Sequence, residues 1–201
     1  MVRVIGFDPG FKSFGYAVVE LRPERDRAVA AGVIRTEKSS KKHNVLSTDD
    51  NFRRARAIAD QIGLLLETWQ PVAMCAESMS YPPSSSAAAK MAMSWGILAT
   101  YSSLRGLALV QASPQEVKKT VWGSKNASKE EVAAAVRSKY PEFAELLSSL
   151  RVPVSLHEHA YDAGAAIITG LRGEILETIR RTLGVEVKTG SVADLRVKPD
   201  P

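Results

Sequence analysis

The first 36 residues contain three apolar runs, and their spacing is the strongest constraint on the fold. The runs span residues 2–8, 14–21 and 28–36, and each has the composition of a β-strand. A glycine-containing loop and a short charged turn join them, and links this short favour antiparallel neighbours. We therefore predict a three-stranded antiparallel meander. Asp8 ends its first strand, and Gly15 in the second would leave room for a ligand backbone to approach closely.

The rest of the chain alternates helical and strand-like patterns. Apolar spacing and cap residues predict helices near 51–68, 87–104, 114–123, 128–140, 158–170 and 173–183, and strands at 72–77 and 107–112. Residues 37–50 are polar and are predicted to form a mobile loop, with Asp49 or Asp50 capping the helix that follows. This order predicts an α/β fold whose five-stranded mixed sheet, the meander plus two further strands, is flanked by helices. Residues 1–171 would form this domain, and 172–201 a C-terminal helix and polar tail.

The composition is that of an ordinary globular protein. The 201 residues suit one domain, with 45% hydrophobic and 24% charged residues. No apolar stretch approaches the roughly 20 residues that cross a bilayer, and the first residues show no secretory signal pattern. Cys75 is the only cysteine and lies in an apolar run, which argues against disulfides and a cysteine-based zinc site. We therefore expect a reduced, cytoplasmic setting without membrane association.

Three carboxylates occupy positions that a fold of this kind could bring together. Asp8 and Glu77 each end a predicted strand, and Asp162 lies on a late helix three residues after His159, on the same face. Any one of these acids alone is better explained as a turn cap or a surface group, but their shared placement favours a site for Mg²⁺ or Mn²⁺. Two ions about 4 Å apart could activate a water and stabilise a leaving oxygen in phosphoryl displacement. Glu158 lies four residues before Asp162, so spacing leaves open whether His159 or Glu158 completes the site.

A cationic segment lies between the second and third acids. The net charge is +5, and clustered cations near a metal site favour a phosphate backbone as the partner. A predicted helix start, capped by Ser128 with Glu131 completing a capping box, would add N–H groups that attract anions. Tyr81, in the loop after Glu77, is the best aromatic candidate for stacking on a base. The predicted DNA-binding residues are Lys118, Lys119, Lys125, Ser128, Lys129 and Tyr81.

Together these motifs resemble the RuvC family of Holliday junction resolvases, which has a ribonuclease H-like fold. The resemblance covers about residues 2–170. It is carried, in chain order, by Gly6-Phe7-Asp8-Pro9-Gly10 with Gly15-Tyr16, by Ala76-Glu77, by Glu116-Val117-Lys118-Lys119 to Gly123 with Ala127-Ser128-Lys129-Glu130-Glu131-Val132, and by His159-Ala160-Tyr161-Asp162-Ala163.

The resemblance implies a homodimer that nicks two opposed strands of four-way junction DNA with Mg²⁺, in DNA recombination and repair. It implies that the metal ligands are Asp8, Glu77, His159 and Asp162, with Lys118 and Lys129 near the scissile phosphates. A branch-migration helicase is a further partner that such an enzyme can have, and no sequence pattern identifies one.

Some positions depart from the family's pattern. The family places a wedging phenylalanine three residues after the second acid, where this chain has Ser80, and Tyr81 is the nearest aromatic residue. The polar segment 37–50 and the tail after about residue 171 are additional. These departures suggest a divergent or phage-type member and affect junction opening more than hydrolysis.

Other classes of protein fit less well. Another ribonuclease H-like nuclease, acting on RNA–DNA hybrids or other branched DNA, is the nearest enzyme alternative. Actin-like ATPases and sugar kinases also carry Asp-x-Gly after a strand, but they need a second glycine-rich phosphate loop and an adenosine motif, and neither pattern is found here. A non-catalytic DNA-binding module is disfavoured because competent residues fill all four expected ligand positions.

Overall fold

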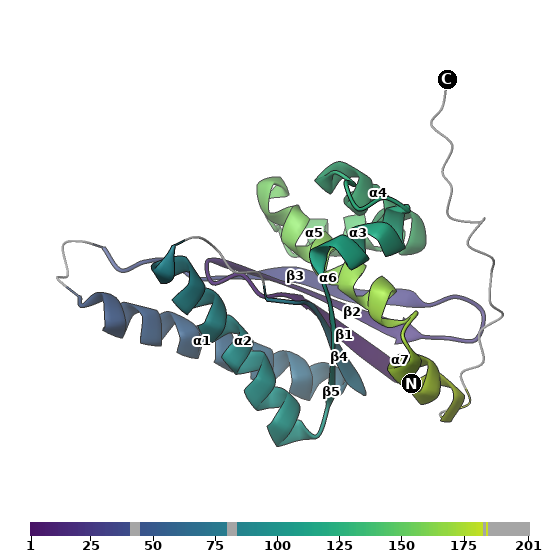
Figure 1. Ribbon diagram of the computed structural model, residues 1–201, viewed down its shortest axis with the longest axis horizontal. Coiled ribbons are helices and arrows are strands. Elements are labelled where there is room, and N and C mark those ends of the chain that lie inside the picture. The colour runs from purple at the N-terminus through teal and green to yellow at the C-terminus, as the bar shows by residue number, and fades with distance from the viewer. Residues whose placement is uncertain (41–44, 80–83, 183, 185–201) are drawn as a thin grey trace.

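The five strands form one mixed sheet, as Figure 1 shows for the computed structural model. The structure describes residues 1–40, 45–79, 84–182 and 184. The strands are β1 (Val2–Asp8), β2 (Ser13–Leu21), β3 (Arg27–Arg35), β4 (Ala73–Glu77) and β5 (Ala108–Ala112), in the spatial order β3-β2-β1-β4-β5. The first three pair antiparallel, and β4 and β5 continue the sheet in parallel with β1. The predicted meander and the mixed five-stranded sheet are confirmed.

Helices cover both faces of the sheet (Figure 1). They are α1 (Ser47–Trp69), α2 (Ser85–Arg105), α3 (Pro114–Trp122), α4 (Lys129–Lys139), α5 (Phe143–Ser149), α6 (His157–Gly170) and α7 (Glu174–Thr182). Helices α1 and α2 pack on one face, and α3 to α6 lie on the other. Within the described ranges, no helix is both long enough and apolar enough to cross a membrane.

The sheet is buried on both faces, which explains why its strands are continuous apolar runs. Successive side chains of β1 point to opposite faces. Val4 therefore packs in the cluster that contains Ile167 of α6, whereas Ile5 and Phe7 pack in the cluster that contains Ile58 of α1. The core thus consists of two layers that share the sheet as their wall.

The predicted N-cap of α1, Asp49 or Asp50, was wrong. Helix α1 begins at Ser47, so part of the segment predicted as a loop is helical, and its N-cap is Leu46 without a side-chain hydrogen bond. Asp50 lies in the first turn, where its carboxylate accepts hydrogen bonds from the Ser39 hydroxyl at 2.7 Å and from Arg53 at 2.8 Å. The Asp50 carboxylate is therefore bound by these side chains and does not cap the helix. Residues 41–44 of the predicted loop lie outside the described part of the chain.

Helix α5 was not predicted. It has only seven residues, and its apolar face consists of the buried Phe143 and Leu147 and the partly buried Leu146. Its Phe143 ring stacks between Tyr140 and Tyr161, with ring centroids 6.1 Å and 5.6 Å away. Helix α5 therefore ties α4 to α6.

Helix α7 is attached to the sheet domain. Leu176 is fully buried in the same cluster as α6, and Arg180 forms an ion pair with Asp26, which lies just before β3. The division at residues 171 and 172 stays a prediction, and most of the predicted polar tail lies outside the described residues.

Helix α6 lies unusually close to β1 and β2. A β-carbon on Gly6 would lie 2.2 Å from the carbonyl oxygen of Ala163, and one on Gly15 would lie 2.0 Å from that of His159. No side chain fits at either distance. Gly15 therefore admits the chain's own helix rather than the ligand backbone that we expected.

Replacing Gly6 tests this close packing. Gly6→Ala should lower the free energy of unfolding by about 2–3 kcal/mol, because the added methyl must push α6 off the sheet. The matched control is Gly96→Ala on the exposed side of α2, where a β-carbon meets nothing within 4 Å and should gain about 0.5–1 kcal/mol from helix propensity. Denaturant titration measures both. A Gly6→Ala protein as stable as the wild type would contradict the packing argument.

Candidate active site

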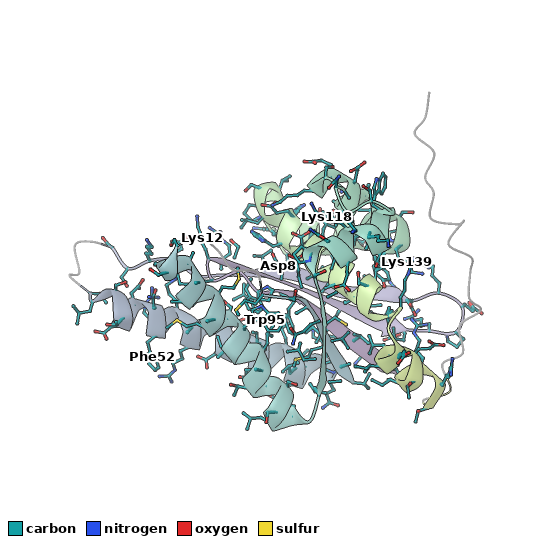
Figure 2. All side chains as sticks on the ribbon, viewed as in Figure 1. Asp8, Lys12, Phe52, Trp95, Lys118 and Lys139 are labelled. Atoms are coloured by element: carbon teal, nitrogen blue, oxygen red, sulfur yellow. The ribbon has the colours of Figure 1, made fainter. Side chains whose placement is uncertain are left out.

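Two of the predicted acids lie side by side where two central strands of the sheet end. Strands β1 and β4 are parallel neighbours, and their register pairs Phe7 with Ala76. The next residues, Asp8 and Glu77, are therefore the adjacent carboxyl-terminal ends of the two strands, the edge where open α/β sheets bind ligands. Figure 2 shows Lys118 above Asp8, on the face of the sheet that α3 and α6 cover.

Helix α6 brings the histidine to the first acid. Asp8 and Gly15 are paired residues of β1 and β2, and the His159 backbone lies against Gly15. This contact places His159 Nδ1 2.7 Å from Asp8 Oδ2, and both side chains remain about one-quarter exposed, at 25% and 24%. The hydrogen bond to Asp8 raises the pKa of His159 above its ordinary value.

The neighbouring Glu158 points to a different partner. Its carboxylate forms an ion pair with Lys129, the first residue of α4. That contact lowers the pKa of Glu158 and raises the pKa of Lys129. Since His159 contacts Asp8 while Glu158 is engaged by Lys129, these contacts favour His159 as the partner of the acids.

Burial and mutual repulsion raise the pKa of two of the acids. Burial raises the pKa of Glu77 to about 7, and the charges of Asp162 and Asp8 add to the effect. Burial likewise raises the pKa of Asp162 to about 6, with Asp8 next in importance. Lys118 and Lys129 act in the opposite direction on Glu77. Like charges held this close favour protonation unless a cation neutralises them.

The donor set suits a hard divalent cation. Asp8, Glu77 and Asp162 offer oxygens and His159 offers a nitrogen, a combination that fits Mg²⁺ or Mn²⁺. Among the described residues, however, no three His, Cys, Asp or Glu side chains already surround a common point at ligand distance. The His159 ring is turned to Asp8 instead. Ion binding would therefore require side-chain rotations, and the charge of the cation would offset the repulsion between the acids.

The predicted DNA-binding residues lie around α3 and α4. Lys118 on α3 and Lys129 on α4 act electrostatically on Glu77, whereas Lys119 and Lys125 are exposed. Ser128 caps α4 as predicted, because its hydroxyl accepts a hydrogen bond from the Glu131 backbone N–H at 3.2 Å and the Glu131 carboxylate accepts one from the Ser128 N–H at 2.7 Å. Tyr81 lies outside the described residues.

The sequence analysis missed a buried arginine behind the loop that follows Asp8. Arg54 of α1 is only 3% exposed and contacts Phe11 and Thr36. A signal was present in the sequence. The buried residues of α1 are spaced four apart, at Asp50, Arg54, Ile58, Ile62 and Leu66, so Arg54 falls on the apolar stripe.

Comparison with known proteins decides the family. The family model described as crossover junction endodeoxyribonuclease RuvC matches residues 4–140. The chain belongs to the RuvC family. A curated RuvC from Moorella thermoacetica is 30% identical over 135 residues, covering 67% of this chain and 75% of that protein. RuvC from Rhodospirillum rubrum is 28% identical over 171 residues, covering 82% and 93%.

Solved structures share the fold. T. thermophilus RuvC in complex with Holliday junction substrate superposes with a TM-score of 0.65 at 24% identity, covering 84% of this chain and 92% of that one. The yeast mitochondrial Holliday junction resolvase Ydc2 gives a TM-score of 0.63 at 13% identity, covering 90% and 82%. The predicted ribonuclease H-like fold of the RuvC family is thus confirmed.

The burial of Glu77 and the charges of the neighbouring acids predict how stability depends on pH. Glu77 has a folded pKa of about 7, above its ordinary value of 4.5. Its contribution to the free energy of unfolding is therefore fully present below about pH 4 and is lost as the pH rises through 7. Without metal, Glu77→Gln should remove on the order of 1–2 kcal/mol of this loss between about pH 4 and pH 8. Denaturant titrations in EDTA at several pH values measure the slope.

The matched control is Glu67→Gln, which changes an exposed acid of α1. Mg²⁺ at pH 8 should raise the melting temperature of the wild type and of Glu67→Gln more than that of Glu77→Gln. Identical pH slopes for the wild type and Glu77→Gln would show that the pKa of Glu77 is not raised in the folded protein.

Proposed function

We propose that this RuvC-family chain is a Holliday junction resolvase that nicks opposed strands of four-way DNA junctions by two-metal-ion phosphodiester hydrolysis. The observation that carries the proposal is the approach of Asp8, Glu77, His159 and Asp162 at one edge of the sheet in a chain of this family. The solved T. thermophilus relative that shares the fold is bound to a Holliday junction substrate. The reaction serves DNA recombination and repair.

The side chains of the site would divide into two groups with different roles in the reaction. Asp8, Glu77, His159 and Asp162 would hold Mg²⁺ ions, which supply an activated water and stabilise the leaving oxygen. Lys118 and Lys129 would bind backbone phosphates and reduce the negative charge that the strand brings to the acids. Until the ions bind, His159 holds the Asp8 carboxylate in place. Mn²⁺ should replace Mg²⁺ because the same oxygen donors suit both.

We further propose that the enzyme is a homodimer. One chain offers one group of acids, and opposed nicks at a junction require two. Helix α2 could supply the contact, because only Ser94 and Leu98 of its 21 residues are buried. Trp95, labelled in Figure 2, and Ile97 are only partly covered, and Met93 is 39% exposed. Met93 and Ile97, four residues apart, lie on one side of the buried Ser94 and Leu98, and Trp95 lies on the other side. Apolar surface left partly exposed in this way is typical of a protein interface.

A cytoplasmic location stays a proposal that rests on the lone cysteine. Cys75 is buried and free, as expected where thiols remain reduced. A branch-migration helicase partner also stays a prediction of family resemblance.

Cleavage of a labelled four-way junction tests the activity. With Mg²⁺ or Mn²⁺ the wild type should make paired, symmetric nicks in the junction and leave a linear duplex and an RNA–DNA hybrid intact. Asp8→Asn should lower the rate more than about 100-fold while junction binding persists. Asp60→Asn, which changes an exposed acid of α1, is the matched control. Equal cutting of the linear duplex or of the hybrid would reject the resolvase proposal, and unpaired nicks would reject the dimer.

The salt dependence of binding tests the phosphate contacts. Lys118→Ala should weaken junction binding uniformly across sequences and reduce the slope of log K against log salt by about 1. Lys139→Ala is the control, because Lys139 lies at the far end of α4, away from Asp8 in Figure 2. Fluorescence anisotropy at several salt concentrations measures both slopes. Equal slopes for Lys118→Ala and Lys139→Ala would remove Lys118 from the DNA-binding surface.

A further inference from the structure

We propose that Arg54 is a positioning residue that fixes the loop after Asp8 and thereby holds the Asp8 carboxylate in its reactive orientation. This inference rests on the proposed function, since it assigns Asp8 to the reaction. Arg54 lies on α1, on the opposite face of the sheet from α6, and it does not reach the acids. It acts through residues 9–12, the segment between β1 and β2, which starts directly after Asp8 and ends at Lys12, both labelled in Figure 2.

The guanidinium of Arg54 makes two contacts with Phe11 of this loop and one with Thr36, the residue after β3. Its Nη2 donates to the carbonyl oxygen of Phe11 at 3.3 Å, and its Nε donates to Thr36 Oγ1 at 3.0 Å. Its Cζ atom lies 4.6 Å from the centroid of the Phe11 ring, a cation–π contact. One side chain therefore restrains both the backbone and the ring of Phe11.

Thr36 connects the same loop to the end of β3. Its hydroxyl donates to the Phe11 carbonyl oxygen at 2.6 Å, and its backbone N–H donates to the Lys12 carbonyl oxygen at 3.0 Å. The hydroxyl accepts from Arg54 and donates to Phe11, so the three groups polarise one another. Two successive carbonyls of the loop are thus held by residues outside it.

The loop has little freedom to absorb a displacement. Only four residues separate Asp8 from Ser13, and the Gly10 N–H donates to the Asp8 carbonyl oxygen at 2.8 Å. A β-carbon on Gly10 would lie 2.1 Å from the Ser13 carbonyl oxygen. A shift of Phe11 must therefore reach the Asp8 backbone.

The charge of Arg54 indicates a role beyond stability. Within the described part of the chain no carboxylate forms an ion pair with Arg54. Asp50, one turn earlier, is bound by Ser39 and Arg53. Burial lowers the pKa of Arg54, and the charge of Asp50 acts in the opposite direction. An apolar side chain would meet the packing need at lower desolvation cost, so the hydrogen bonds that orient the loop explain the arginine better.

Two variants and a matched control test the proposal. Arg54→Met keeps the aliphatic part of the side chain but loses the guanidinium. Thr36→Val removes the hydroxyl that accepts from Arg54 Nε and leaves the Arg54 side chain itself unchanged. Arg56→Met is the control, because Arg56 lies on the same helix with its side chain 73% exposed. Hydrogen exchange of the peptide spanning residues 9–13 reports on the loop without any substrate. Single-turnover cleavage at saturating enzyme reports on the orientation of Asp8, and junction binding is measured separately.

In both variants the exchange of residues 9–13 should accelerate while the protection of β4 and α6 stays as in the wild type. Cleavage should slow by about 10- to 100-fold, the cost of a misplaced reacting group, with junction affinity unchanged within about twofold. Arg54→Lys should not restore the rate, because an ammonium cannot make the forked contact. The double variant should be no slower than the slower single variant, since both act through one contact.

The outcomes separate this inference from the function. Wild-type exchange in the loop, or wild-type cleavage by folded Arg54→Met or Thr36→Val, would overturn the positioning role. An equal loss in Arg56→Met would also overturn it. If Arg54→Met does not fold, Thr36→Val decides. If the wild type cuts no junction, the resolvase proposal fails, whereas accelerated loop exchange in the variants still supports the restraint.

Discussion

The close packing of α6 on β1 and β2 is the contact on which the rest of the site depends. Gly6 and Gly15 remove the side chains that would otherwise separate helix from sheet, so that the Ala163 and His159 carbonyls rest almost on the strands. The same contact buries the small residues of α6 and places His159 at Asp8. The contact that packs α6 on the sheet is therefore also the contact that positions His159 beside Asp8.

The site combines rigid support with unfavourable charge. Asp8 and Glu77 come from paired strands at the centre of the sheet, and neither can move far without breaking that pairing. Burial and mutual repulsion nevertheless raise the pKa of Glu77 and Asp162. A site of this kind gives up folding free energy to keep charges together, an arrangement that is common where a protein binds cations or performs catalysis.

Much of the sheet could be predicted because its information is local. The runs that became β1, β2 and β3 follow one another with short links, and the placement of Asp8 and Glu77 followed from where two runs end. Contacts between distant residues were harder. Asp50 was expected to cap a helix, but Ser39, eleven residues earlier, binds its carboxylate. The choice between His159 and Glu158 depends on Gly15 and Lys129, which no spacing rule connects to them. The burial of Arg54 was detectable only from its position on the stripe of α1.

The sheet order also determines when the chain can become a nuclease. Strands β1 to β3 pair with near neighbours in sequence, and such local contacts form fast. The acids, in contrast, lie far apart in the sequence. Glu77 joins β1 through a parallel pairing across α1, and Asp162 arrives on a helix more than 150 residues after Asp8. A chain emerging from the ribosome, or one cut before α6, therefore contains the first acid and its strand without the complete constellation. If the proposed four side chains carry the reaction, cleavage competence is a property of the finished fold, and a partly synthesised copy that lacks α6 would leave DNA intact.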